Sequence, residues 1–286
     1  MALEILLARD MGFCWGVRRA IDMMETAANQ RGQIISLGPI VHNPQVVASL
    51  GEKGVQVADN LDNVDGAPVA ITAHGVGPGA LEEARTRGLE VVDTTCPIVT
   101  RSQRWAHKLA ANGFTIVVYG DAEHREVKGV LSWAGERSFA LTEETVDSLP
   151  EKLASRVAII SQTTQSPARF AAFVARFLER WLPHINELRV INTLCGVTAN
   201  QQAAAQELAH EVDLVLVIGG RTSANTRHLM EVCQQEGVET HHIETAAEVE
   251  AGWLAGRERV GVTAGASTPD SAVEAVVRRI QELAQG

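Results

Sequence analysis

The chain repeats one pattern three times. Three cysteines each lie 24 residues before a glycine that ends a hydrophobic run, and the pairs are Cys14 and Gly38, Cys96 and Gly120, and Cys195 and Gly219. A polar side chain able to bind an anion follows four residues after each glycine, at His42, His124 and Ser223. Cysteine is a poor choice for a repeated structural position unless its sulfur is used. The spacing therefore predicts three equivalent lobes whose sulfurs share one purpose.

Each repeat has the pattern of an α/β lobe. A predicted helix follows each cysteine, at Gly16 to Asn29, Val99 to Asn112 and Ala199 to Glu211. A strand comes next, QIISLG, FTIVVYG or DLVLVIGG, and its β-branched run ends in glycine. A second helix begins near Asn43, Arg125 and Asn225 and leads to a short strand, VQVA, SFAL or THHI. This alternation predicts parallel sheets flanked by helices.

A further strand in each repeat ends in a seven-residue loop with a terminal proline. These loops are Thr72 to Pro78, Ser161 to Pro167 and Thr263 to Pro269. Parallel sheets place ligand loops at the carboxyl ends of their strands, so each lobe has two candidate ligand loops. We expect lobes at residues 14–95, 96–193 and 194–286 with 1–13. Packing around a pseudo-threefold axis would bring the three cysteines together.

Three thiolates in one register suit an iron-sulfur cluster with three anchored irons and a fourth iron open to substrate. Zinc with three cysteines and a histidine is the rival, but structural zinc sites use close ligand pairs, and these cysteines are 82 and 99 residues apart. The structural alternative is that the three cysteines are buried in the core and act only as small hydrophobic side chains. Cys233 has no counterpart in the other repeats and is predicted to be a core residue.

Composition limits the partners and the compartment. The formal net charge of -10 and a pI near 5.4 disfavour nucleic acid and anionic membranes as main partners. The first residues have no basic region, and no segment approaches 18 uninterrupted apolar residues. We therefore expect a soluble, cytoplasmic protein whose four scattered cysteines stay reduced or bind metal.

The loops carry a set of side chains that could hold a phosphate or diphosphate. The set is His42, His74, His124, Thr163, Thr164, Ser223, Asn225 and Ser267. Several of these lie at predicted helix starts, where unpaired N–H groups also favour anions. Helix capping is the alternative for Ser223 and Asn225. The six remaining histidines lack this placement and are expected to be ordinary surface or core residues.

Glu126 lies two residues after His124, on the first turn of a predicted helix. The helix dipole alone would stabilise a carboxylate at this position. If the side chain instead faces a buried cluster and an anion, it could donate protons, and that role requires a raised pKa.

The motifs together resemble a known family. FCWGVRRAI, PIVHNPQVV, TAHGVGP, DTTCPIV, HREVKG, SQTTQS and GVTAGASTP occur in this order and are similar to 4-hydroxy-3-methylbut-2-enyl diphosphate reductase, the LytB/IspH family. The resemblance spans the whole chain. It implies a three-lobed α/β enzyme, a monomer or loose dimer, around a 4Fe-4S cluster held by Cys14, Cys96 and Cys195. It also implies the last step of the non-mevalonate (MEP/DOXP) isoprenoid pathway.

In that step the substrate's allylic hydroxyl meets the open iron, two electrons and protons enter, water leaves, and isopentenyl and dimethylallyl diphosphate form. A ferredoxin or flavodoxin is the implied electron donor. Six residues match diphosphate-binding residues of the family by position: His42, His74, His124, Ser223, Asn225 and Ser267. The neighbouring Ala224 is included in the expected substrate-binding set. Glu126 matches the proton-relay glutamate, and Thr163 and Thr164 match threonines beside the substrate hydroxyl. Glu126, Thr163 and His124 are the expected catalytic residues.

The sequence also departs from the family pattern. Seven positions differ from the usual residue: Gln103, Asp121, Arg125, Asn192, Gln201, Thr222 and Ala224. These changes leave the three cysteines in place and bear on the choice of substrate. The alternatives are a paralogous iron-sulfur reductase or dehydratase that acts on a related allylic diphosphate, and a non-enzymatic iron-sulfur sensor.

Overall fold

The computed structural model describes residues 3–62, 64–149 and 155–285. The predicted lobe ranges also include residues 1–2, 63, 150–154 and 286, which lie outside the described residues. The chain divides into two compact units. One consists of Met1–Arg18, Val41–Ser49 and Gly196–Gly286, and the other of Arg19–Ile40 and Leu50–Cys195.

Three four-stranded parallel sheets form the framework, and all three have the same strand order. In each sheet the strand after the cysteine's helix pairs with two neighbours, and the strand that precedes the next cysteine in the repeat forms an edge. The predicted α/β fold with three lobes is therefore confirmed. All strands of a given sheet fall inside one predicted lobe range, while the bounds of the lobes stay a prediction.

The first lobe holds the sheet β3-β2-β4-β5. Its strands are β2 (Ile34–Leu37), β3 (Val55–Ala58), β4 (Val69–Ile71) and β5 (Val91–Asp93). The helices in this stretch of chain are α1 (Trp15–Arg31), α2 (Pro44–Glu52) and α3 (Pro78–Thr86). Ala84 of α3 packs with Ile35, Leu37 and Ile71 in the core of this lobe.

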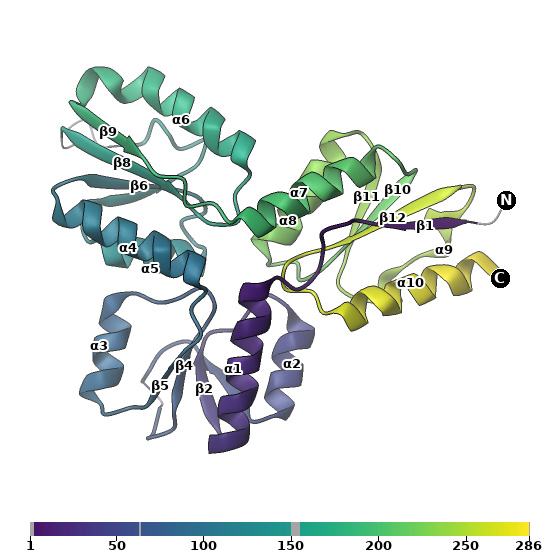
Figure 1. Ribbon diagram of the computed structural model, residues 1–286, viewed down its shortest axis with the longest axis horizontal. Coiled ribbons are helices and arrows are strands. Elements are labelled where there is room, and N and C mark those ends of the chain that lie inside the picture. The colour runs from purple at the N-terminus through teal and green to yellow at the C-terminus, as the bar shows by residue number, and fades with distance from the viewer. Residues whose placement is uncertain (1–2, 63, 150–154, 286) are drawn as a thin grey trace. The chain divides into compact units, whose positions relative to one another are not determined.

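The second lobe holds the sheet β7-β6-β8-β9. Its strands are β6 (Thr115–Tyr119), β7 (Ser138–Leu141), β8 (Arg156–Ser161) and β9 (Glu187–Val190), and its helices are α4 (Pro97–Ala111), α5 (Arg125–Ala134), α6 (Pro167–Trp181) and the short η1 (Leu182–His184). Helix α6 covers one face, where Phe173 stacks on Tyr119 with ring centroids 4.6 Å apart. Helices α4 and α5 cover the other face (Figure 1).

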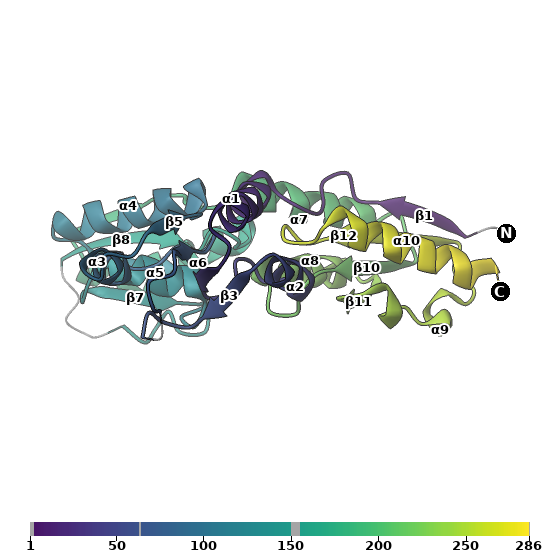
Figure 2. The same cartoon turned by 90° about the horizontal axis from the view of Figure 1, so that it is seen from below.

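The third lobe holds the sheet β1-β12-β10-β11. Its strands are β1 (Glu4–Leu7), β10 (Leu214–Ile218), β11 (Glu239–Ile243) and β12 (Arg259–Ala264), and its helices are α7 (Gly196–Ala209), α8 (Ala224–Gln235), η2 (Ala246–Glu248), α9 (Ala251–Leu254) and α10 (Asp270–Gln285). Helices α7 and α8 pack on one face and α10 on the other. Strand β1 begins and α10 ends at the same end of this lobe (Figures 1 and 2).

Most predicted elements agree with the structure, with two kinds of difference. Strands β3 and β7 have the predicted bounds, whereas the third predicted helix begins at Gly196 instead of Ala199. The sequence patterns did not predict β1, β5 or β9, because these edge strands are only three or four residues long and mix exposed and half-buried positions. Within the described ranges, none of the helices has the length and apolar character needed to cross a membrane.

Candidate active site

Each cysteine of the repeat is fixed to one of the proline-terminated loops by its backbone. The amide of Cys14 donates to the carbonyl of Ala266 at 3.1 Å, that of Cys96 to Ala73 at 3.0 Å, and that of Cys195 to Thr163 at 2.8 Å. Sequence spacing did not predict these bonds, which join two segments distant in the chain. Each bond ties a cysteine to the proline-terminated loop of the preceding repeat, with the third repeat preceding the first.

Each of the three cysteines directly precedes a helix, α1, α4 or α7. The Sγ atom of Cys14 accepts from the N–H of Val17 at 3.4 Å. Cys96 is the N-cap of α4, and the N–H groups of Ile98 and Val99 in the first turn of this helix lower the pKa of its thiol. Such bonds stabilise a thiolate. All four cysteines of the chain carry thiols.

Burial acts in the opposite direction at Cys96. Loss of contact with water raises the pKa of the Cys96 thiol above its usual range, and the two N–H groups lower it. Negative charge on Cys195 and Glu126 raises this pKa further. A half-buried thiol close to a second thiol and a carboxyl is a group that a metal ion readily deprotonates.

Cys233 has a different environment, as predicted. Its side chain is fully buried among Ala205, Val217 and Leu229 in the core beside β10. Burial raises the pKa of this thiol to about 12, and its sulfur donates to the carbonyl of Ala205 at 3.7 Å. Cys233 is therefore a core residue.

Glu126 lies on the first turn of α5, and its carboxyl group faces Thr163. The N–H of Thr163 donates to Oε1 at 2.7 Å, and the hydroxyl of Thr163 lies 2.8 Å from Oε2. Both side chains are buried, with only 2% of Glu126 and 5% of Thr163 exposed. Glu126 and Thr163, which were predicted separately from the sequence, thus contact each other inside the second lobe.

The buried position changes the acidity of Glu126. Loss of hydration raises the pKa of its carboxyl from 4.5 to about 7, while the two bonds from Thr163 oppose the shift. A carboxyl group with such a pKa can hold or release a proton near neutral pH. This meets the condition that the proton-donor role of Glu126 requires.

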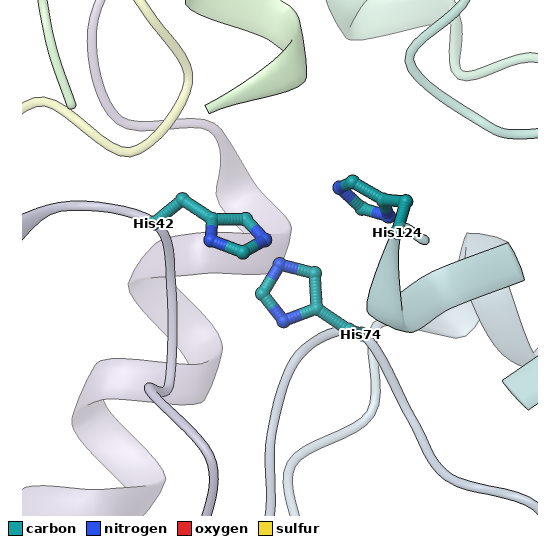
Figure 3. Close-up of side chains that lie close together, drawn as sticks. All are labelled: His42, His74 and His124. Carbon is teal, nitrogen blue, oxygen red and sulfur yellow. The ribbon is translucent and has the colours of Figure 1, made fainter. Parts of the chain in front are cut away.

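His124 and His74 lie side by side in this same unit (Figure 3). Their ring centroids are 5.6 Å apart, with the rings nearly perpendicular. His124 is the N-cap of α5, and its Nδ1 accepts a hydrogen bond from the N–H of Glu126 at 3.2 Å. An imidazole that accepts at Nδ1 carries its proton on Nε2. The cap therefore orients His124 so that Nε2 is a hydrogen-bond donor.

The loop that carries Thr163 and Thr164 also contains a buried glutamine that the sequence analysis missed. Gln162 is 1% exposed, and its Oε1 accepts from the N–H of Asp121 at 3.1 Å. Its Nε2 donates to the hydroxyl of Thr164 at 3.3 Å. Gln162 thus joins the two ligand loops of the second lobe. Its place between Ser161 and the two threonines was the only signal for it in the sequence.

The other unit contains the remaining predicted anion ligands. Ser223 caps α8 by accepting from the N–H of Thr226 at 3.3 Å, so its capping role is confirmed, and Ala224 is the first residue of the helix. Asn225 is not a cap. Its Nδ2 donates to Oε1 of Gln201 at 2.9 Å, and its buried Oδ1 has no hydrogen-bond partner among the described residues.

His42 and Ser267 lie together in this unit. The hydroxyl of Ser267 donates to the carbonyl of His42 at 3.5 Å. Gly220 packs against the same carbonyl so closely that a Cβ atom there would lie 2.2 Å from the oxygen. Asn43, which the sequence analysis noted only as a helix start, is buried and caps α2 through its Oδ1. Gly220 and Ser267 thus hold the backbone of the His42 loop in place. Figure 3 shows the His42 side chain.

Comparison with known proteins decides the family. The model of the LytB protein family matches residues 5–281. The chain belongs to the LytB family. A 4-hydroxy-3-methylbut-2-enyl diphosphate reductase of Dehalococcoides mccartyi is 45% identical over 285 residues, which cover 99% of this chain and all of the relative. The reductase of Geobacter sulfurreducens is 46% identical over 282 residues, 98% of each chain.

Solved structures of LytB family reductases have the same fold. The E-1-hydroxy-2-methyl-but-2-enyl-4-diphosphate reductase of Plasmodium falciparum is 27% identical with a TM-score of 0.89, over 97% of this chain and 88% of the other. A second structure, of an (E)-4-hydroxy-3-methyl-but-2-enyl diphosphate reductase described as the terminal enzyme of the non-mevalonate pathway, is 38% identical with a TM-score of 0.70. It covers 99% of this chain and all of the other.

Two departures from the LytB pattern have clear structural roles. Arg125, at the position of a common proline, packs over Gly38 and pairs with Asp59 at 3.2 Å. Asn192, at the position of an aspartate, accepts from the N–H of Leu194 at 3.0 Å. In the first lobe Asp93 makes the equivalent bond with the N–H of Thr95 at 2.9 Å. The amide in Asn192 therefore preserves the turn that precedes the third cysteine.

Proposed function

We propose that this LytB family chain catalyses the reductive dehydroxylation of (E)-4-hydroxy-3-methylbut-2-enyl diphosphate to isopentenyl and dimethylallyl diphosphate. One observation carries the proposal. Thr163 contacts the buried acid Glu126 through its N–H and hydroxyl, and its carbonyl accepts from the N–H of Cys195. Thr163 thus connects Glu126, an acid that can donate a proton near neutral pH, to Cys195, one of the three repeated cysteines.

The cysteines have the chemistry that a 4Fe-4S cluster requires. We propose Cys14, Cys96 and Cys195 as its ligands, because thiolates are the usual cluster ligands and each of the three has its backbone fixed to a loop. The N–H of Val17 donates to the sulfur of Cys14, and N–H groups of α4 lower the pKa of the Cys96 thiol; donors of this kind tune the sulfurs of a cluster. When bound, the cluster supplies electrons one at a time and an iron that polarises the substrate hydroxyl.

The reaction needs protons as well as electrons. The C–O bond of the allylic alcohol breaks, two electrons enter the allyl group, one proton leaves with the hydroxyl as water, and a second proton adds to carbon. We propose Glu126 as the proton source. A neutral Glu126 can donate from Oε2 to the hydroxyl of Thr163, and that hydroxyl can then donate its own proton onward. Burial keeps Glu126 protonated up to about pH 7.

The diphosphate end of the substrate needs strong hydrogen-bond donors. We propose His42, His74, His124, Thr164, Ser223, Ala224, Asn225 and Ser267 as the substrate-binding residues, with Thr163 beside the hydroxyl. Capping fixes the donor nitrogen of His124 in advance, so little entropy is lost when an anion binds. Anchoring the diphosphate leaves binding energy for placing the hydroxyl group.

An external one-electron carrier must supply the electrons, and we propose a ferredoxin or flavodoxin in the cytoplasm. The net charge of this chain is -10, so the chain would need a locally basic surface to receive such a carrier.

The cysteine assignment can be tested by anaerobic reconstitution with iron and sulfide. Separate Cys→Ser variants at positions 14, 96 and 195 should lose the brown colour and dye-driven turnover, whereas Cys233→Ser should keep both. Cys233 is the matched control because it is a thiol in the core of the third lobe. Retention of a complete cluster by all three ligand variants would overturn the proposal.

A further inference from the structure

A polar side chain on α1 contacts the loop that leads to the second cysteine. The guanidinium Nη1 of Arg19 donates to the carbonyls of Thr94 at 3.5 Å and Thr95 at 3.3 Å. These are the two residues before Cys96, and Arg19 itself lies five residues after Cys14. The helix that follows one cysteine therefore supplies a donor to the loop of the next.

The same contact recurs on α4. Arg101 lies five residues after Cys96, and its Nη2 donates to the carbonyls of Asn192 at 3.4 Å and Leu194 at 3.3 Å. Leu194 directly precedes Cys195. The donor again comes from the helix of one cysteine and the acceptors from the loop of the next.

The third repeat makes the contact with an amide. Gln201 on α7 lies six residues after Cys195, and its Nε2 donates to the carbonyl of Gly12 at 2.9 Å. Gly12 lies two residues before Cys14. In chain order the contacts therefore pass from the first cysteine's helix to the second cysteine, from the second to the third, and from the third to the first.

We propose that Arg19, Arg101 and Gln201 are positioning residues, each holding the loop that presents the next cysteine. The architecture explains why such residues are needed. The strands before the cysteines, β5, β9 and β1, are sheet edges of three or four residues, so few ladder bonds fix the loops that follow them. A donor from a packed helix supplies the missing restraint and satisfies loop carbonyls at the same time.

Gln201 makes a second contact, in which its side chain is the acceptor. Its Oε1 accepts from Nδ2 of Asn225 at 2.9 Å, and its Nε2 is committed to Gly12. This fixes the orientation of the Asn225 amide, with Oδ1 left as an acceptor that has no partner among the described residues. An arginine at position 201 could contact Gly12 but could not accept from Asn225.

The proposal can be tested by cysteine alkylation in the full chain, stripped of iron and followed site by site. Arg19→Met should speed alkylation of Cys96 about tenfold and leave Cys14 unchanged. Arg101→Met should speed alkylation of Cys195 to a similar extent and leave Cys96 unchanged. Gln201→Met should speed alkylation of Cys14 and leave Cys195 unchanged. Arg101→Lys should restore part of the protection, because lysine keeps one donor group without the planar fork.

Matched controls lie on the same helices. Arg18, whose exposed side chain pairs with Asp270 at 2.9 Å, and Arg104, which is exposed on α4, should give wild-type alkylation rates as Met variants. Cys233 reports general loosening of the fold because it is fully buried. Faster alkylation of the cysteine at the start of the variant's own helix, a parallel rise at Cys233, or no change at any cysteine would each overturn the proposal.

A second measurement uses the iron-loaded chain and rests on the proposed function. Each of the three Met variants should lose iron to a chelator about 10 to 100 times faster than the wild type. If the alkylation pattern holds but the chain binds no iron, the proposed cofactor fails and the positioning role stands. If iron binds normally and the alkylation pattern is absent, the positioning role fails.

Discussion

Both carboxyl oxygens of Glu126 contact Thr163, one through the backbone N–H at 2.7 Å and the other through the hydroxyl at 2.8 Å. The two residues are 37 positions apart in the chain, on α5 and on the loop after β8. This contact places a buried acid and a hydroxyl in line, so that a proton can pass from one to the other.

Replacing Glu126 with glutamine should remove the proton source while keeping the shape of the side chain. We expect turnover of the hydroxymethylbutenyl diphosphate to fall about 100- to 10,000-fold, the usual contribution of a general acid. The visible spectrum of the cluster should stay the same. Glu123→Gln is the control, because Glu123 is highly exposed and pairs with Lys128 on the surface. Near-normal turnover by Glu126→Gln would contradict the assignment.

Thr163→Val should separate the hydroxyl from the backbone contact. Valine keeps the N–H that bonds Oε1 of Glu126 and lacks the hydroxyl that lies beside Oε2. Turnover should fall about 100-fold at saturating substrate, with iron content unchanged, because proton transfer is interrupted. Thr163→Ser restores a hydroxyl and should recover most of the rate. Equal losses in the valine and serine variants would argue against a relay.

The stability of the chain should depend on pH through Glu126. Because its pKa rises from 4.5 to about 7 on folding, the folded chain binds a proton that the unfolded chain releases between these pH values. The free energy of unfolding contributed by this group therefore falls as pH rises through that window, by about 3 kcal/mol in total. Denaturant unfolding of wild type and Glu126→Gln at several pH values would measure it. The wild-type value should decline relative to the variant as pH rises, and a constant difference would contradict the shift.

His124 should affect stability and substrate binding separately. His124→Ala loses the cap on the N–H of Glu126 and should lower the free energy of unfolding by about 1 kcal/mol. His124→Asn keeps a capping oxygen and should lose less. Both variants lack the Nε2 donor, so both should raise KM about tenfold, as expected for one hydrogen bond to a charged group. If asparagine restored KM as well as stability, His124 would be only a cap.

The repeat register made much of the fold predictable from sequence. The buried central strands, such as β6 and β10, are continuous apolar runs bounded by glycine, and such runs are strong strand signals. The edge strand β9 reads ELRV, and four residues are too few for this alternation to be a strand signal, so its place in the sheet follows from pairing with β8. Helix α7 begins at Gly196, three residues before the predicted start at Ala199. The early start gave no signal in the sequence because glycine has weak helix propensity.

The site was predictable as a set of residues but not as a set of contacts. Loop position indicated Glu126 and Thr163 separately, and only the folded chain brings them together. Gln201 was noted solely as a departure from the family pattern, because its contacts are with Gly12 and Asn225, far away in sequence. Buried glutamines such as Gln162 and Gln201 give no periodic signal in the sequence. Their roles depend on tertiary geometry.

The most direct measurement is anaerobic turnover with a reduced one-electron dye and (E)-4-hydroxy-3-methylbut-2-enyl diphosphate as the only substrate. The proposed function predicts that brown, iron-loaded protein oxidises two dye molecules for each diphosphate consumed, and that isopentenyl and dimethylallyl diphosphate appear in the same total amount. A colourless protein that binds no iron, or consumption of the diphosphate without any dye oxidation, would contradict it.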